Sequence, residues 1–107
     1  MSPTVYLLTG ANRGIGLGLA KQIAARPDTI VFAGARNPDR ATDLHALAAA
    51  HPGRVHVLKI VSADRASNAA AVKEVKRVAG RLDVVIANAG MSDCFKPALE
   101  RMLVDSI

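Results

Sequence analysis

The sequence predicts an α/β fold in which a parallel sheet carries helices on both faces. Short runs of Val, Ile and Leu alternate with Ala-rich segments whose apolar residues recur every three to four positions. Aromatic residues make up only 3% of the chain, so the core must be mainly aliphatic, as is typical of helices packed on buried parallel strands. A glycine cluster directly follows the first apolar run, where a strand would turn into a helix.

Strands are expected over residues 4–9, 29–35, 55–60 and 83–87. We expect helices over residues 14–25, from the Asn37-Pro38-Asp39 turn to the break at Pro52, over 69–79 and over 97–107, with a polar loop at 62–67. In the first helix, Ile15, Leu19 and Ile23 are predicted to form the apolar face. Strand–helix alternation predicts right-handed crossovers, three αβα layers and the strand order 3-2-1-4.

Residues 1–107 are interpreted as one domain, truncated after its fourth strand. The net charge is +5, but Lys and Arg are scattered without interleaved aromatic residues, so no nucleic-acid partner is expected. A single cysteine, Cys94, excludes an internal disulfide. With no apolar run approaching 18 residues and no leader pattern, we expect a cytoplasmic protein without a membrane partner. His45, His51 and His56 lack metal-ligand spacing, so no metal site is expected.

The most informative segment is Thr9-Gly10-Ala11-Asn12-Arg13-Gly14-Ile15-Gly16, between a predicted strand and a predicted helix. Gly10 would allow the sharp turn, Gly14 the approach of a pyrophosphate to the backbone, and Gly16 close packing of the helix on the sheet. Free N–H groups at the helix start would then point at the phosphates. This arrangement predicts a Rossmann-type dinucleotide site.

The residue at the end of the second strand indicates which dinucleotide is bound. NAD-binding domains usually place a carboxylate there to hold the ribose 2′-hydroxyl, whereas this chain has Arg36 followed by Asn37. A guanidinium can grip a 2′-phosphate through two N–H groups, and Arg13 is a second candidate for the same contact. The sequence therefore favours NADP, as NADPH, over NAD.

The glycine motif and the Asn88-Ala89-Gly90 segment after the fourth strand together resemble the classical short-chain dehydrogenases/reductases, from Thr4 to Gly90. Within that family, the segments Tyr6 to Gly16 and Ala35-Arg36-Asn37 resemble fungal ketoreductases of the norsolorinic acid type. Val61 and Ala87 depart from the family pattern, which often has Asp and Asn there. The resemblance implies cofactor contacts at Gly10, Asn12, Arg13, Gly14, Ile15, Gly16, Arg36, Asn37, Asn88, Ala89 and Gly90. Asn88 could equally tie neighbouring strands together.

The resemblance also implies hydride transfer between the nicotinamide and a carbonyl or alcohol carbon, with a serine and a Tyr-x-x-x-Lys pair as catalytic groups. The only tyrosine is Tyr6, and Gly10 stands four residues later, so no catalytic residue is named. We expect the cofactor-binding part of an NADP-dependent oxidoreductase, inactive as a fragment. The alternative is a non-catalytic nucleotide-binding module. An S-adenosylmethionine methyltransferase is disfavoured, because it would usually have an acidic residue at the end of the second strand, where this chain has Arg36. Substrate, reaction direction and homo-oligomerisation stay open.

Overall fold

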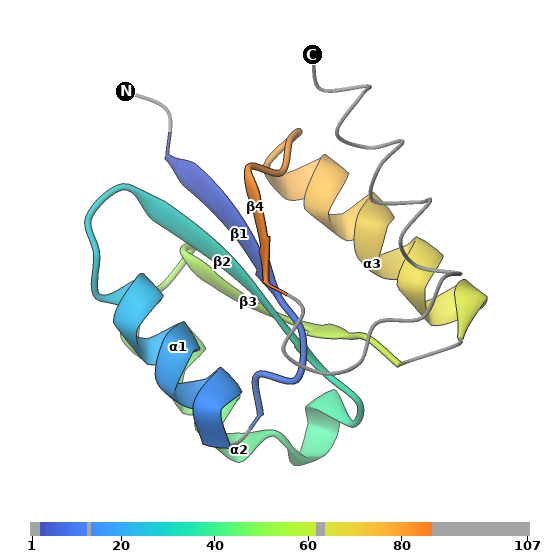
Figure 1. Ribbon diagram of the computed structural model, residues 1–107, viewed down its shortest axis with the longest axis horizontal. Helices are drawn as coiled ribbons and strands as arrows, with labels where there is room; N and C mark the ends of the chain where they lie inside the picture. Colours follow the sequence, from blue (N-terminus) through green and yellow to red (C-terminus); the bar gives the residue numbers. More distant parts are fainter. Residues whose placement is uncertain (1–2, 13, 62–63, 87–107) are drawn as a thin grey trace.

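The computed structural model describes residues 3–12, 14–61 and 64–86 of the chain. Four parallel strands form one sheet in the order β3-β2-β1-β4, which confirms the predicted topology (Figure 1). The elements are β1 (Thr4–Leu8), α1 (Gly14–Ala24), β2 (Thr29–Ala35), the 3₁₀ turn η1 (Pro38–Arg40), α2 (Thr42–Ala50), β3 (Val55–Lys59), α3 (Arg65–Val78) and β4 (Val84–Ile86). Residue 87 of the predicted strand at 83–87 lies outside the described residues, and so does the whole of the predicted helix at 97–107.

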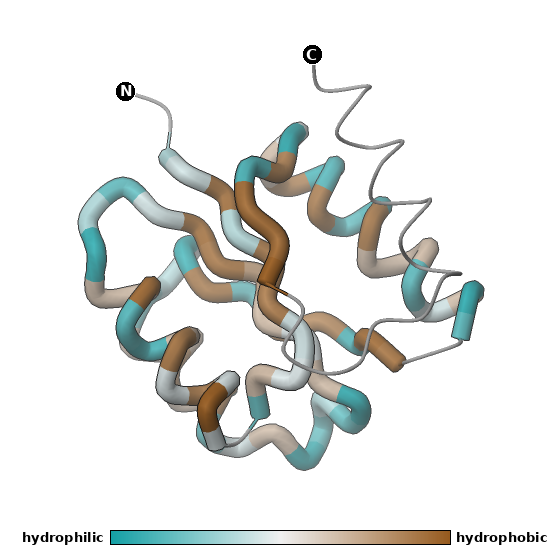
Figure 2. Tube along the Cα trace, viewed as in Figure 1, coloured by the Kyte–Doolittle hydropathy of each residue, from teal (hydrophilic) through white to brown (hydrophobic). Residues whose placement is uncertain are grey.

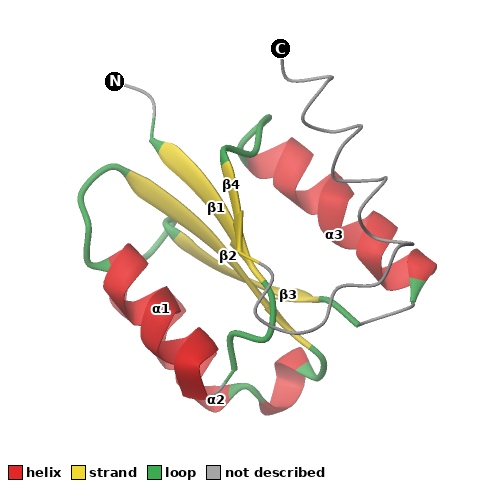
Figure 3. Ribbon diagram, in the orientation of Figure 1, coloured by secondary structure: helices red, strands yellow, loops and turns green. Residues whose placement is uncertain are grey.

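Helices cover both faces of the sheet, as predicted for a doubly wound fold (Figure 3). Successive side chains of a strand point to opposite faces, so each strand contributes to two separate cores. Leu8, Val31 and Ala33 pack with α1 and α2 on one face. Phe32 and Val75 belong to the second core, beneath α3. Figure 2 shows hydrophobic residues along the strands and alternating with hydrophilic ones along the helices.

The buried face of α1 differs from the predicted one. Gly16, Ala20, Ile23 and Ala24 are buried, whereas Ile15 is 78% exposed. The predicted apolar stripe of Ile15, Leu19 and Ile23 is therefore wrong in its first member. Small side chains occupy the buried face, because Gly and Ala allow the helix axis to approach the sheet closely. Ile15 is left beside the glycine turn rather than in the core.

Helix α3 begins at Arg65, four residues before the predicted start at 69. The Asp64 carboxylate caps it by accepting a hydrogen bond from the Ser67 N–H at 3.3 Å. Such a cap satisfies one of the amides that have no partner within the helix. The predicted loop at 62–67 therefore becomes the first turn of the helix from Arg65 onward. The polar composition of this segment reflects capping and exposure rather than a loop.

Arg54, just before β3, ties together three elements at the amino-terminal edge of the sheet. Its guanidinium donates to the Ala24 carbonyl at 2.9 Å, to the Thr29 carbonyl at 3.2 Å and to the Thr29 hydroxyl at 3.0 Å. It also contacts the Arg26 carbonyl. These carbonyls belong to the end of α1, to the turn after it and to the start of β2. At the end of α1 a cation also interacts favourably with the helix dipole. This side chain thus links the end of α1 with the starts of β2 and β3.

Among the described residues, no helix has the length and apolar character required to cross a bilayer.

Candidate functional site

The candidate site lies at the carboxyl ends of β1 and β2, where the chain leaves the sheet. Thr9 is buried and its N–H donates to the Ile86 carbonyl at 3.1 Å, which extends the β1–β4 pairing. Gly10 then adopts a φ of 61°, a left-handed conformation that favours glycine. The next amide, of Ala11, donates to the Gly34 carbonyl at 2.9 Å. This bond fixes the turn against the end of β2.

Gly14 begins α1 with a φ of 58° and borders open space, since a Cβ built there would meet no protein atom within 4 Å. The exposed side chain of Ile15 follows, and Gly16 is buried against the sheet. The start of α1 therefore has a bare backbone on its outer side. An 11-residue helix that begins beside such a turn presents free N–H groups and the positive end of its dipole to that space.

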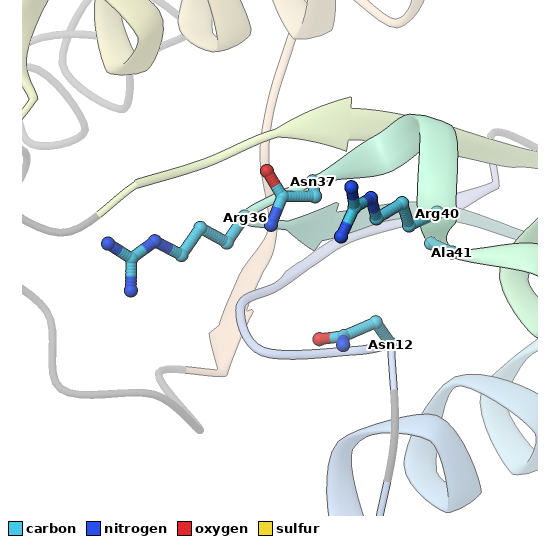
Figure 4. A pocket seen from close by; sticks show the side chains of 5 residues that line it. All are labelled: Asn12, Arg36, Asn37, Arg40 and Ala41. Atoms are coloured by element: carbon cyan, nitrogen blue, oxygen red, sulfur yellow. The ribbon is translucent and has the colours of Figure 1, made fainter.

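A hollow of about 300 Å³ lies next to this turn, lined by Asn12, Arg36, Asn37, Arg40 and Ala41 (Figure 4). Asn12 comes from the glycine turn, Arg36 and Asn37 from the end of β2, and Arg40 from η1. Within the described part of the chain, neither the Arg36 nor the Arg40 guanidinium takes part in an ion pair or side-chain hydrogen bond. Two arginines without an ion pair and two asparagines therefore line one small space, a composition that suits an anion.

The structure brings together three of the residues predicted from sequence, namely Asn12, Arg36 and Asn37, around the same hollow. Gly10, Gly14, Ile15 and Gly16 follow one another along the adjoining turn and helix. Arg13, Asn88, Ala89 and Gly90 lie outside the described residues. Across residues 3–12, 14–61 and 64–86, His, Cys, Asp and Glu side chains form no group of three that could hold a metal ion.

Sequence reasoning missed Arg40, although a local signal points to it. Pro38 favours a tight turn, and the resulting η1 closes with the Arg40 N–H donating to the Asn37 carbonyl at 3.0 Å. The Ala41 N–H donates to the Pro38 carbonyl at 3.1 Å. The turn folds the chain back, so that the residue four positions after Arg36 lines the same hollow.

A parallel sheet of order 3-2-1-4, with a glycine turn between its first strand and first helix, defines a Rossmann-type nucleotide-binding protein. Ligands of this class bind outside the carboxyl ends of the strands, where this hollow lies. The family model for short chain dehydrogenase matches residues 4–105, and the chain belongs to that family. The resemblance inferred from the glycine motif and from Asn88-Ala89-Gly90 is thereby confirmed.

Several fungal oxidoreductases are similar in sequence. The norsolorinic acid ketoreductase of Aspergillus parasiticus is 43% identical over 98 residues, covering 89% of this chain and 36% of that protein. An uncharacterized oxidoreductase of Schizosaccharomyces pombe is 38% identical over 95 residues, covering 89% of this chain and 37% of that protein. The chain thus spans less than two-fifths of the length of either relative.

Solved structures of oxidoreductases share the fold. NADPH-bound carbonyl reductase from chicken fatty liver superposes with a TM-score of 0.77 at 29% identity, covering 97% of this chain and 48% of that one. L-Sorbose reductase from Gluconobacter frateurii, complexed with NADPH and L-sorbose, gives a TM-score of 0.77 at 25% identity, covering 99% of this chain and 48% of that one. Both relationships extend over nearly all of this chain.

Proposed function

We propose that this chain forms the NADP(H)-binding part of an oxidoreductase that reduces a carbonyl group or oxidises the corresponding alcohol. The observation that carries the proposal is Arg36, at the end of β2 and on the rim of a hollow shared with Asn12 and Asn37. A carboxylate at this place would favour the 2′-hydroxyl of NAD, and a guanidinium favours the 2′-phosphate of NADP. The two NADPH-bound reductases of similar fold support this choice.

In this proposal the residues of the chain divide the dinucleotide between them. The turn from Gly10 to Gly16, including Asn12, Arg13, Gly14 and Ile15, contacts the pyrophosphate and adjoining ribose. Backbone amides and the α1 dipole supply most of that interaction. Arg36 and Asn37 contact the adenosine phosphate. Asn88, Ala89 and Gly90 contact the cofactor ribose.

NADPH supplies the hydride when bound, and the described part of this chain supplies binding and orientation. The bare backbone beside Gly14 lets phosphate oxygens approach the amides directly. The 107 residues contain no Tyr-x-x-x-Lys, because Tyr6 is the only tyrosine and Gly10, not a lysine, stands four residues after it. We therefore assign no proton-transfer step to any residue of this chain. Its role is to hold the cofactor in place for groups outside these 107 residues.

Titration of the chain with NADPH and NADH tests the proposed cofactor preference. Arg36→Asp should weaken NADPH relative to NADH by about 1–3 kcal/mol, because a charge-assisted contact is lost and a repulsion is added. Arg26→Asp is the matched control, since Arg26 is exposed near the amino-terminal end of β2, at the opposite edge of the sheet. An unchanged NADPH/NADH affinity ratio in Arg36→Asp would exclude Arg36 as the selector.

The absence of Tyr-x-x-x-Lys also favours a second candidate, a non-catalytic module that binds a nucleotide without turnover. The two candidates differ in what the gene encodes after Ile107. A serine followed by Tyr-x-x-x-Lys would support the oxidoreductase. A continuation without these residues, or a stop codon, would support the binding module.

A further inference from the structure

The hollow beside the glycine turn is lined by another arginine besides Arg36. Arg36 and Arg40 both line it, four residues apart in the chain. In Figure 4 the Arg36 side chain extends outward from the end of β2, whereas that of Arg40 reaches back above Asn12 toward Asn37. In this view the Arg40 guanidinium is drawn beside Asn37, and that of Arg36 points away from both.

We propose that Arg40, beside Arg36, is a further specificity-determining arginine for the 2′-phosphate, and that His45 is the positioning residue that holds the turn carrying it. This inference rests on the proposed NADP(H)-binding function and extends it to two residues outside the glycine motif. A phosphate monoester carries about −1.5 to −2 charges at neutral pH, so one guanidinium leaves much of that charge unbalanced. Arg36 and Arg40 together match it.

The protein itself leaves both guanidinium groups available for such a ligand. Two carboxylates lie nearby in sequence, Asp39 in η1 and Asp43 in the first turn of α2, and both residues are exposed. Neither forms an ion pair with Arg36 or Arg40 within the portion of the chain that the structure describes. An anion entering the hollow would therefore displace water rather than break an existing ion pair.

Two hydrogen bonds to the Pro38 carbonyl hold the turn that carries Arg40. The His45 Nε2 lies 2.7 Å from the Pro38 carbonyl oxygen, and because a carbonyl can only accept, Nε2 must carry the proton. The same oxygen accepts the Ala41 N–H at 3.1 Å, so both of its lone pairs are used. Ala41 is only 5% exposed and anchors the end of the turn in the core. Arg40 thus projects from a backbone fixed on both sides.

Two small probes isolate the phosphate contact from the rest of the dinucleotide. Adenosine 2′,5′-bisphosphate carries the 2′-phosphate, and adenosine 5′-monophosphate lacks it. Calorimetric titration of the 107-residue chain should show preference for the bisphosphate. Arg40→Gln should reduce that preference about five- to thirtyfold, because one charge-assisted contact at an exposed site is lost. The matched control Arg26→Gln should leave it unchanged.

The role of His45 is tested through Arg40. His45→Ala should reduce the preference about two- to fivefold, in keeping with the loss of one exposed hydrogen bond. His45→Gln should restore it, because the glutamine amide can donate to the same carbonyl. In the Arg40→Gln background, His45→Ala should have no further effect on the preference, since positioning without the guanidinium contributes nothing. Thermal unfolding of each variant separates these effects from loss of fold.

The outcomes distinguish this inference from the function on which it rests. A wild-type preference that survives Arg40→Gln but disappears in Arg36→Gln would overturn the role of Arg40 and leave the NADP(H) proposal standing. Equal effects of His45→Ala with and without Arg40 would overturn the positioning role. A wild-type chain that binds both probes equally, or neither, would overturn both the inference and the proposed cofactor preference.

Discussion

Gly34 is the residue at which the structure reverses a simple expectation about stability. A glycine inside a strand is usually less favourable than alanine, because it loses more backbone freedom on folding, by about 0.5–1 kcal/mol. Gly34 lies in β2 and is buried. A Cβ built on it would lie 2.4 Å from Cδ1, 2.9 Å from Cγ1 and 3.1 Å from Cβ of Ile60. Gly34→Ala should therefore destabilise the protein.

The size of the effect follows from these contacts. The first distance can be relieved by rotating the end of the Ile60 side chain, but the contact with its Cβ requires the backbone to move. Overpacking of this kind costs about 1–3 kcal/mol. Subtracting the gain in backbone entropy leaves a net loss of about 0.5–2 kcal/mol, or a fall in melting temperature of about 2–16 °C for a domain of this size.

Thermal and urea unfolding of four proteins measure this effect: wild type, Gly34→Ala, Ile60→Val and the double variant. Ile60→Val removes Cδ1, so the penalty of Gly34→Ala should be smaller in that background. Gly18→Ala is the matched control, because Gly18 lies within α1 and a Cβ added there would meet no atom within 4 Å. It should stabilise the protein by about 0.5–1 kcal/mol.

A Gly34→Ala variant as stable as wild type would refute this account of the packing. So would an equal penalty in the presence and absence of Ile60→Val. The same substitution should also weaken nucleotide binding, because the Gly34 carbonyl accepts the Ala11 N–H at 2.9 Å and thereby holds the glycine turn. Intact binding in a destabilised variant would show that the turn does not depend on the position of this carbonyl.

Three further predictions concern the helix cap, an exposed ion pair and turnover. Asp64→Ala should lower the free energy of unfolding by about 0.5–2 kcal/mol in urea denaturation, through loss of the cap on the Ser67 amide, and Asp64→Asn should retain most of it. The hydrogen bond from Arg77 lowers the pKa of Glu74, so any stabilisation from this pair is present above the ordinary glutamate pKa and disappears as the pH falls through the lowered value. NMR titration of Arg77→Ala should show the pKa of Glu74 rising toward its ordinary value while the unfolding midpoint is unchanged, because the Arg77 and Glu74 side chains are 71% and 38% exposed. Residues 1–107 should oxidise no NADPH with a panel of aliphatic and aromatic ketones, because Tyr6 is the only tyrosine, and turnover by a purified monomer would contradict this.

The strand order and the position of the glycine turn could be predicted because they depend on local patterns. Apolar runs such as residues 29–35 become strands buried on both faces, and the bounds of β2 agree with the prediction. The start of α3 could not be placed from the same pattern. Its first turn is polar, because Asp64 caps it, and the segment therefore resembled a loop.

The other differences depend on contacts between residues distant in sequence. Ile15 has the spacing of a core residue, but the small residues Gly16 and Ala20 decide which side of α1 approaches the sheet. The place of Arg36 at the end of β2 could be predicted because it directly follows an apolar run. Arg40 could not, because its place depends on how η1 folds back. The close contact between Gly34 and Ile60 likewise requires the pairing of β2 with the end of β3.

The anchoring of α1 by Arg54 has a mechanical consequence for the site at the other end of that helix. Helix α1 has 11 residues and is therefore about 16 Å long. It runs from the carboxyl-terminal edge of the sheet back to the amino-terminal edge. Its carboxyl end is held at the Ala24 carbonyl, and the chain before its amino end is held at Ala11. Hydrogen bonds thus hold both the carboxyl end of α1 and the chain that leads into the proposed phosphate site before any ligand binds. We expect loss of the Arg54 contacts to disturb the proposed site, although Arg54 does not line the hollow.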